Sequence, residues 1–141
     1  APYPMFSGSG ALWGETILFS MCILEEMQWK RTRYITSADF FHGTLELVEP
    51  GVPVFLFMGE DENRKLDERV RAFLTRGVTG DTDINIIDTA EFAIPGLDDE
   101  FRVIVSPWIL SSLITDRLAA YYETVPKHNL NYRRYYHQFD Y

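Results

Sequence analysis

A chain of 141 residues is long enough for one domain with a real core and too short for two ordinary domains. Hydrophobic residues make up 46% of it and charged residues 24%, a balance that argues against disorder and for a compact fold. The net charge of −8 argues against a surface that binds nucleic acid or anionic membranes.

Basic residues are concentrated in two short stretches, Lys30–Arg33 and the pair Arg133–Arg134, which leave room for local phosphate-binding pockets. The apolar run Ala11–Leu24 is too short to span a bilayer and contains Glu15, so it predicts a buried helix and no membrane segment. A single cysteine, Cys22, excludes an intramolecular disulfide and fits a reducing compartment. We therefore expect a cytoplasmic protein that binds neither nucleic acid nor membranes.

Strand patterns and helix patterns alternate along the chain. A strand over Tyr3–Phe6 runs into the glycine turn Ser7–Gly10, and an apolar helix over Ala11–Trp29 follows. Runs of β-branched, aromatic or continuous apolar residues predict four more strands, and helical spacing and start signals predict three more helices. The strands are Thr32–Thr36, Val52–Met58, Ile84–Ile87 and Phe101–Val105; the helices are Ala38–Val48, capped by Ser37, then Arg64–Arg76 and Trp108–Thr124.

This alternation favours an α/β fold, because right-handed crossovers place helices on both faces of a parallel sheet. We expect a three-layer α/β/α sandwich with a five-stranded parallel sheet in the flavodoxin-like order 2-1-3-4-5. Pro126 ends the last helix, so the domain would cover residues 1–126. The aromatic segment 127–141 would be a C-terminal tail that packs on the active site or on a neighbouring subunit. The apolar first helix indicates a buried interface.

Two polar stretches carry the candidate chemistry, Glu25–Trp29 at the end of the first helix and Ser37–Gly43 after the second strand. A helix end, a strand and a loop connect them, so Glu26 and His42 can come close together. Carboxylates and imidazoles are common proton-transfer groups in enzymes. The residues alone leave a second interpretation open, a solvated helix end and an ordinary loop histidine.

The order of these residues resembles a known family. Glu26-Met27-Gln28-Trp29, then Ser37-Ala38-Asp39-Phe40-Phe41-His42-Gly43, with Glu26 and His42 sixteen positions apart (42 − 26), resembles the second sugar isomerase (SIS) domain of the fructosamine 6-phosphate deglycases. These proteins carry two SIS domains and are related to the isomerase half of glucosamine-6-phosphate synthase. The tail adds His128, Arg133-Arg134-Tyr135 and Asp140-Tyr141 at the family's spacing. The likeness covers nearly the whole chain.

The resemblance implies a reaction and a site. A fructosamine 6-phosphate, an Amadori compound, would isomerise to an imine, which is hydrolysed to glucose 6-phosphate and a free amine. Glu26 would move the proton between C1 and C2, and His42 would assist ring opening or protonate the leaving oxygen, in its own site or in the neighbouring subunit's. The residues expected to contact substrate are Ser7, Ser9, Arg133, Arg134 and Tyr141, although a turn role for the two serines stays open.

No metal ion or organic cofactor is implied. The expected partners are the sugar 6-phosphate, a first SIS domain of the same protein whose Ser/Thr-rich loop holds the phosphate, and a second copy in a dimer or larger homo-oligomer.

Several positions depart from the family pattern. Ile23 stands where the aminosugar synthase has a lysine, which disfavours that enzyme's chemistry, while Asp39 and Thr44 replace the usual Glu and Pro. Tyr132 and His137 differ from the commonest tail residues. Two other functions therefore stay open: a non-catalytic SIS domain that senses a sugar phosphate, and an aldose-ketose phosphosugar isomerase that releases no amine.

Overall fold

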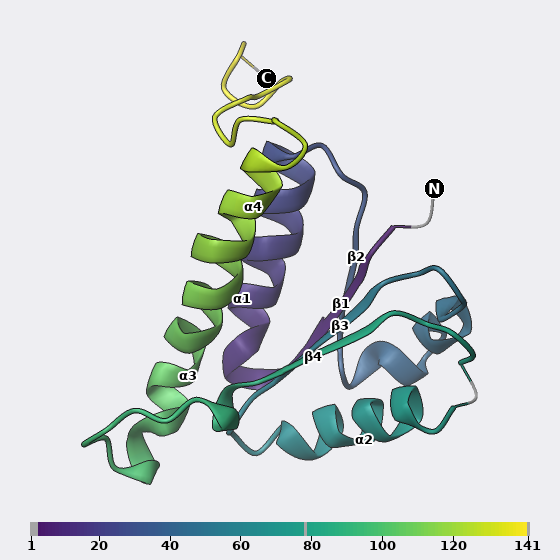
Figure 1. The fold of residues 1–141 in the computed structure, drawn as a ribbon, viewed down its shortest axis with the longest axis vertical. Helices are drawn as coiled ribbons and strands as arrows, with labels where there is room; N and C mark the ends of the chain where they lie inside the picture. The colour runs from purple at the N-terminus through teal and green to yellow at the C-terminus, as the bar shows by residue number, and fades with distance from the viewer. Residues whose placement is uncertain (1–2, 78, 141) are drawn as a thin grey trace.

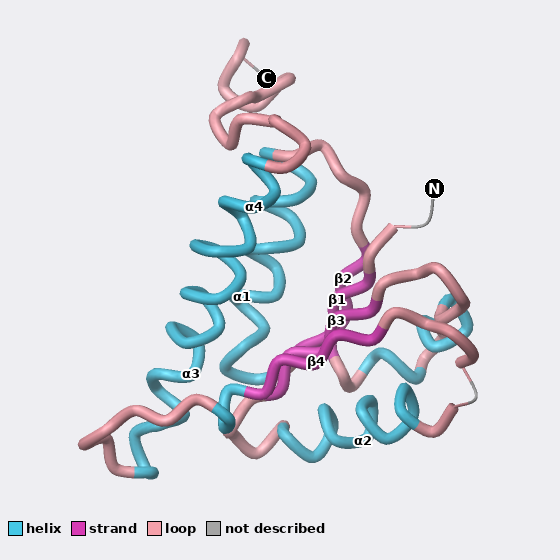
Figure 2. The backbone as a smooth tube through the Cα atoms, in the orientation of Figure 1, coloured by secondary structure: helices cyan, strands magenta, loops and turns pink. Residues whose placement is uncertain are grey.

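A four-stranded parallel sheet forms the middle layer of the protein, which we describe from a computed structural model for residues 3–77 and 79–140. The strands are β1 (Met5–Gly8), β2 (Arg33–Thr36), β3 (Val54–Met58) and β4 (Ile84–Asp88). They lie in the order β2-β1-β3-β4 with helices on both faces (Figures 1 and 2). The predicted three-layer α/β fold is confirmed, and the strand order follows the predicted one as far as the fourth strand.

Two long helices lie side by side on one face of the sheet (Figure 1). The first consists of η1 (Gly10–Leu12), α1 (Trp13–Ile17) and the π-helical η2 (Leu18–Met27); the second consists of η6 (Asp99–Phe101), α3 (Arg102–Ser111), the π-helical η7 (Ser112–Leu118) and α4 (Ala119–Thr124). The opposite face is covered by α2 (Arg64–Thr75) and by two short 3-10 turns, η3 (Asp39–Phe41) and η4 (Thr44–Leu47). A further turn, η5 (Thr89–Glu91), follows β4.

Successive side chains of each strand point to opposite faces, and this alternation builds two separate cores. Between the sheet and the two long helices, the buried residues are Phe6, Leu12, Phe19, Ile23, Leu24, Phe57, Leu110, Ile114 and Ala119. Between the sheet and α2, they are Met5, Phe40, Val52, Val54, Leu56, Met58, Val70 and Leu74. Both faces of β3 are therefore apolar, which explains its continuous hydrophobic run.

The predicted fifth strand, Phe101–Val105, is wrong, because these residues begin the second long helix. Acidic residues in the preceding turn favour a helix start. Pro107 lies inside α3 and cannot donate to the carbonyl of Val103. The hydroxyl of Ser106 donates to that carbonyl at 3.1 Å instead, so the helix continues through the proline.

The predicted helix Ala38–Val48 is also wrong in detail, since η3 and η4 are separate turns. Gly43 lies between them with φ of +127°, a conformation that interrupts a helix. Ser37 does not cap this segment, because its hydroxyl is donated to the Asp67 carboxylate of α2.

The helix from Asp99 to Thr124 is long and apolar enough to cross a membrane, judged by length and composition alone. Of its most apolar window, 22% is buried. Within the helix, Ile104, Trp108 and Tyr121 are 67%, 70% and 66% exposed. Long apolar helices also occur in globular proteins that contact no membrane. The sequence did not reveal this helix because it predicted a strand over the first turns.

Gly10 occupies the turn from β1 into the first long helix, with φ of +54°. The Asp61 carboxylate accepts from the next backbone N–H, that of Ala11, at 2.6 Å. A Cβ at position 10 would overlap that carboxylate. Glycine is therefore required here both for backbone conformation and for space.

We expect Gly10→Ala to lower the free energy of unfolding by about 1–3 kcal/mol, because the strain of positive φ and the displaced carboxylate add. Gly14→Ala is the matched control, since nothing lies within 4 Å of a Cβ at this helical position. It should be neutral or stabilising by up to about 1 kcal/mol. Urea denaturation of both variants checks this, and equal stabilities would contradict the assignment.

Candidate functional site at the end of the first helix

Ser7 and Ser9 lie in a buried polar network at the carboxyl end of β1. The hydroxyl of Ser7 is 3.1 Å from that of Ser37, which donates to Asp67 at 2.6 Å. Ser9 Oγ accepts from the backbone N–H of Ser37 at 3.0 Å. All four side chains are at most 4% exposed, and burial raises the pKa of Asp67. These hydroxyls connect the strand ends to α2 and are engaged inside the fold.

Two ion pairs fill the neighbouring part of the same sheet edge. Arg64 donates to both carboxylate oxygens of Asp88, at 2.8 and 2.6 Å. Arg102 donates from Nε to Glu60 at 2.6 Å. Parallel α/β sheets commonly bind ligands beyond their carboxyl ends. In this chain, the charged side chains of these two ion pairs are bonded to each other at that edge.

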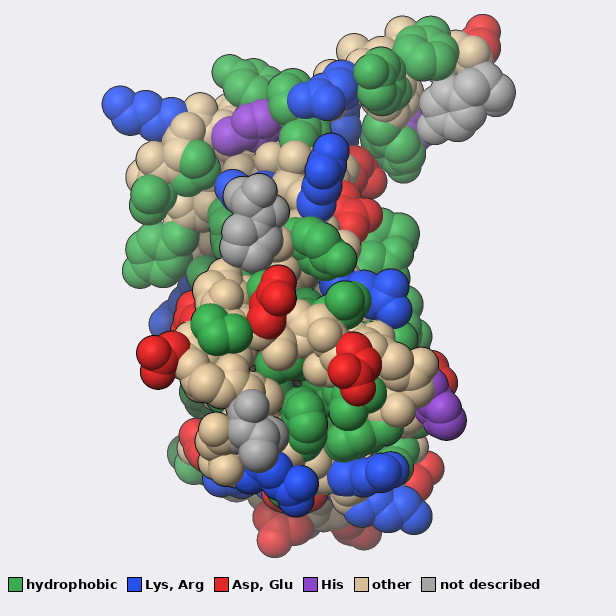
Figure 3. Space-filling model, turned by 90° about the vertical axis from the view of Figure 1, so that its right-hand side faces the viewer, with side chains coloured by type: hydrophobic (Ala, Val, Ile, Leu, Met, Phe, Trp, Pro, Cys, Tyr) green, Lys and Arg blue, Asp and Glu red, His purple; other side chains and the backbone are tan. Residues whose placement is uncertain are grey.

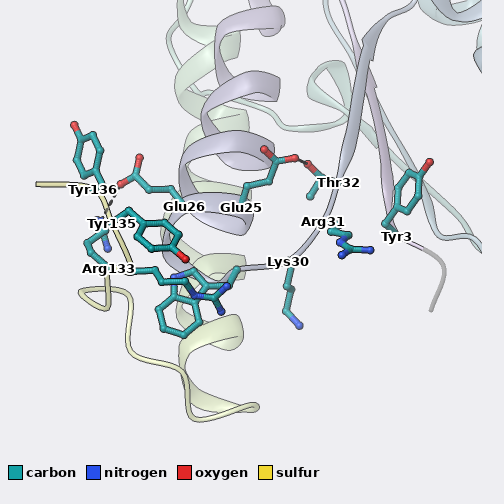
Figure 4. Close-up of a pocket in the computed structure, with 11 residues that line it drawn as sticks. Tyr3, Glu25, Glu26, Lys30, Arg31, Thr32, Arg133, Tyr135 and Tyr136 are labelled. Carbon is teal, nitrogen blue, oxygen red and sulfur yellow. Dashed lines mark hydrogen bonds and ion pairs between the residues drawn. The ribbon is translucent and has the colours of Figure 1, made fainter. Parts of the chain in front are cut away.

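A cavity of about 680 Å³ lies at the opposite, amino end of the sheet. Tyr3 precedes β1, and Arg31 and Thr32 precede β2, so the cavity opens where these strands begin (Figure 4). The tail overhangs this end of the molecule, with basic and acidic side chains gathered beneath it (Figure 3). The lining residues are Tyr3, Glu25, Glu26, Trp29, Lys30, Arg31, Thr32, Arg133, Arg134, Tyr135 and Tyr136.

The two basic stretches of the sequence meet in this cavity. Lys30 and Arg31 come from the loop before β2, and Arg133 and Arg134 come from the tail, about a hundred positions later. They line the C-terminal end of the first helix, which carries the partial negative charge of the helix dipole. The cavity therefore has an excess of basic side chains although the whole chain is acidic.

The two carboxylates at the helix end point in different directions (Figure 4). Glu26 faces the tail and forms a salt bridge with Arg133, with Nε 2.9 Å from Oε1. These side chains are 26% and 18% exposed, so the pair is partly shielded from water. Glu25 faces the loop before β2 and accepts from the hydroxyl of Thr32 at 2.6 Å. Glu26 is thus the carboxylate beneath the tail.

Trp29 attaches the tail to the helix end. It follows the last helical turn with φ of +54°, which redirects the chain. The guanidinium of Arg134 lies 4.2 Å from the centre of its ring, and the His128 ring packs edge-on at 4.5 Å. Gln28 donates to the carbonyl of His128 at 2.7 Å. Through these contacts the tail packs on the end of the first helix within one copy of the chain.

His42 is not part of this cavity. It follows η3, whose Phe40 belongs to the core against α2, whereas Glu26 is on the helix that packs on the other sheet face. The imidazole is exposed. Within one copy of the chain, the structure does not bring Glu26 and His42 together. Tyr141, predicted to contact substrate, lies outside the described residues.

Comparison with known proteins gives a consistent relationship, although no family model matches the chain. The fructosamine deglycase FrlB of Bacillus subtilis is 32% identical over 130 residues, which cover 90% of this chain and 38% of the relative. The fructoselysine 6-phosphate deglycase of Escherichia coli is 34% identical over 116 residues, covering 80% and 31%.

A solved structure from Salmonella typhimurium, assigned as a phosphosugar isomerase, matches with a TM-score of 0.85 and 30% identity over 99% of this chain and 42% of that one. The chain is a sugar isomerase (SIS) domain related to the fructosamine deglycases. It spans 38% and 31% of the length of the two curated relatives.

Sequence reasoning missed most of the cavity wall of this SIS domain. Glu25, Lys30, Arg31 and Thr32 were not among the predicted site residues, and neither was Trp29. The positions of the basic residues could have indicated this cavity, because the two basic stretches noted in the sequence both contribute to its lining. Their meeting depends on tail docking, which periodicity cannot predict.

We expect Trp29→Gly to release the tail without disturbing the helix end, because glycine adopts positive φ readily. Loss of the ring contacts with Arg134 and His128 should accelerate tryptic cleavage in the tail on the order of tenfold, the equivalent of about 1–2 kcal/mol. Trp108→Ala, which removes an exposed ring on α3, is the control. Equal cleavage rates for Trp29→Gly, Trp108→Ala and the unmodified chain would show that Trp29 does not hold the tail.

The ion pair between Arg64 and Asp88 should make stability depend on pH. Arg64 holds the pKa of Asp88 below its usual value, so this contribution is complete above the pKa of the unfolded chain, about 3.9, and is lost as the pH falls through the folded-state pKa. Asp88→Asn should cost about 1–3 kcal/mol at pH 7 and flatten the loss of stability below pH 4.

Unfolding free energies at pH 7 and in the acid range check this prediction. Asp81→Asn, at an exposed position, is the control. An acid dependence as steep in Asp88→Asn as in the unmodified chain would contradict the assignment.

Proposed function

We propose that this SIS domain is the second, C-terminal SIS domain of a fructosamine 6-phosphate deglycase and that it supplies the base for proton transfer. The observation that carries this proposal is the position of Glu26 in a cavity where both basic stretches and the aromatic tail converge. Residues 1–126 would form the domain, and residues 127–141 would cover its site. The deglycases among its relatives support this assignment.

The proposed chemistry begins with proton transfer. The Glu26 carboxylate removes a proton from C1 of the open-chain fructosamine 6-phosphate, electrons move to the C2 carbonyl, and its oxygen takes up a proton from the medium to give an enaminol. Return of the proton from Glu26 to C2 and loss of the N–H proton to the medium give the C1 imine of glucose 6-phosphate. Water then adds to C1 and the C–N bond breaks, releasing the amine and glucose 6-phosphate. Isomerisation and hydrolysis therefore consume one water molecule and need no redox step.

The charge of the cavity suits an anionic substrate. Four basic side chains and two carboxylates line it, so it can attract a sugar phosphate even though the chain as a whole repels anions. We propose that a Ser/Thr-rich loop of a first SIS domain grips the phosphate, since Ser7 and Ser9 are engaged in internal hydrogen bonds. This domain would then present Glu26 to C1 and C2.

His42 would act in the site of a second copy. It is exposed and lies on the opposite side of the sheet from Glu26, so a shared site requires another subunit. Exposed apolar side chains along the helix Asp99–Thr124, among them Ile104 and Trp108, provide surface for such assembly. We propose a homodimer in which each site combines Glu26 of one copy with His42 of the other. Such a dimer accounts for the separation of the two residues within one copy and for the exposed apolar surface.

Products separate this proposal from the two alternatives. A sensing domain would bind the sugar phosphate without turnover, and an aldose-ketose isomerase would interconvert sugar phosphates without releasing an amine. The test uses protein expressed from the complete native reading frame, with fructoselysine 6-phosphate as substrate. Glucose 6-phosphate and lysine should appear in equal amounts; binding without either product would refute the deglycase assignment.

We expect Glu26→Gln and His42→Asn each to lower kcat by about 100- to 10,000-fold, because each removes a proton-transfer group. Glu49→Gln, at an exposed position that does not line the cavity of Glu26, is the control. Unchanged turnover in either variant would remove that residue from the mechanism.

Mixing the two inactive variants tests whether a site is shared between subunits. After subunit exchange, half of the dimers combine one copy of each, and one of their two sites is intact, so activity should return to about one quarter of the unmodified level. If Glu26 and His42 acted within one copy, both sites of the mixed dimer would be defective and no activity would return.

A further inference from the structure

We infer that Arg133 is a positioning residue that fixes the Glu26 carboxylate for proton transfer, rather than a residue that grips the substrate. This inference rests on the proposed function and goes beyond it, because the sequence predicted Arg133 only as a substrate contact. It follows from which groups its guanidinium contacts.

Three of the five N–H donors of Arg133 are engaged inside the chain. Nε contacts Glu26 Oε1 at 2.9 Å, and Nη1 donates to the carbonyls of Leu130 and Tyr132 at 2.6 and 2.9 Å. The side chain is 18% exposed. The guanidinium keeps only the two N–H groups of Nη2 for a phosphate or a sugar hydroxyl, while its other three donors hold the carboxylate and two carbonyls.

The backbone behind Arg133 is fixed to the second long helix. The N–H of Leu130 donates to Glu123 Oε1 of α4 at 3.1 Å. The N–H of His128 donates to the backbone carbonyl of Glu123, also at 3.1 Å. Glu123, Leu130, Arg133 and Glu26 therefore form a continuous series of contacts from one long helix to the other. The orientation of the Glu26 carboxylate depends on both helices.

Arg134, the next residue, has a different environment. Its guanidinium stacks on the face of Trp29 at 4.2 Å, which leaves its edge N–H groups available within the cavity. Adjacent arginines thus divide two tasks: Arg133 holds the base, and Arg134 can meet an anionic group of the substrate.

Positioning has a kinetic signature that substrate binding lacks. A base displaced by about 1 Å can lose on the order of 100-fold in rate. The loss appears in kcat, because the interaction acts on the transition state, whereas loss of a substrate contact raises KM. The planar arginine fork sets the carboxylate geometry, and lysine cannot reproduce it.

The test compares Arg133→Gln and Arg133→Lys in protein expressed from the complete native reading frame, with fructoselysine 6-phosphate, both unlabelled and deuterated at C1. Arg71→Gln is the matched control, since Arg71 is an exposed arginine on α2 with a 3.8 Å contact to Glu68. We expect kcat to fall about 100-fold in Arg133→Gln with KM changed less than about threefold. The deuterium isotope effect on kcat should rise, because proton transfer becomes slower than later steps.

Arg133→Lys should have a kcat only slightly above that of Arg133→Gln. If Arg133→Gln fails to fold, the kcat, KM and isotope effect of Arg133→Lys test the inference in its place. A rise in KM with kcat unchanged would show that Arg133 binds substrate and would overturn the inference. Normal kinetics in both variants would overturn it as well. Absence of turnover in the unmodified protein would refute the proposed function and this inference together, whereas turnover without the expected kcat loss would refute the inference alone.

Discussion

The end of the first long helix concentrates negative charge, and the candidate site depends on how that charge is neutralised. The C-terminal end of η2 is the negative end of the helix dipole, and Glu25 and Glu26 add two carboxylates there. The chain places basic side chains around this end from two directions, the loop that leads into β2 and the C-terminal tail. The salt bridge between Arg133 and Glu26 joins the C-terminal tail to the helix.

This arrangement places the site at an unusual edge for a parallel sheet. Open α/β sheets usually bind ligands beyond the carboxyl ends of their strands. Here that edge carries a buried network around Asp67 and the ion pairs of Arg64 and Arg102, all of which hold strands and helices together. The cavity lies instead where the strands begin. One edge of the sheet therefore contributes stability, and the other carries the cavity.

The main features of the fold could be predicted from the sequence because they follow from local pattern. The alternation of apolar strands and amphipathic helices specified the layers, and residues such as Phe57 and Leu56 had to face opposite cores. Burial and the charge of Glu26 raise the pKa of Cys22, which disfavours its thiolate form. The error at Phe101–Val105 arose because β-branched and aromatic residues suit both a strand and an exposed apolar helix face.

The candidate site was less predictable, since it depends on contacts between distant residues. Glu26 could be selected because a carboxylate at a helix end was combined with a family resemblance. Arg134 was expected at the site from the resemblance alone. The part of the wall formed by Lys30 and Arg31 could not be predicted, because the docking of the tail depends on Trp29 and Gln28 meeting His128, a hundred positions later. The internal engagement of Ser7 and Ser9 likewise depends on Asp67, which comes from α2.

The central claim is that the reacting carbons of a sugar phosphate lie beneath the tail, against Glu26. A crystal structure of the native-length protein with bound glucose 6-phosphate tests it most directly. The account predicts C1 and C2 at about 3–3.5 Å from the Glu26 carboxylate, in the cavity that Trp29 and the tail enclose. A sugar bound at the carboxyl ends of β1 and β3, remote from Glu26 of either copy, would contradict it.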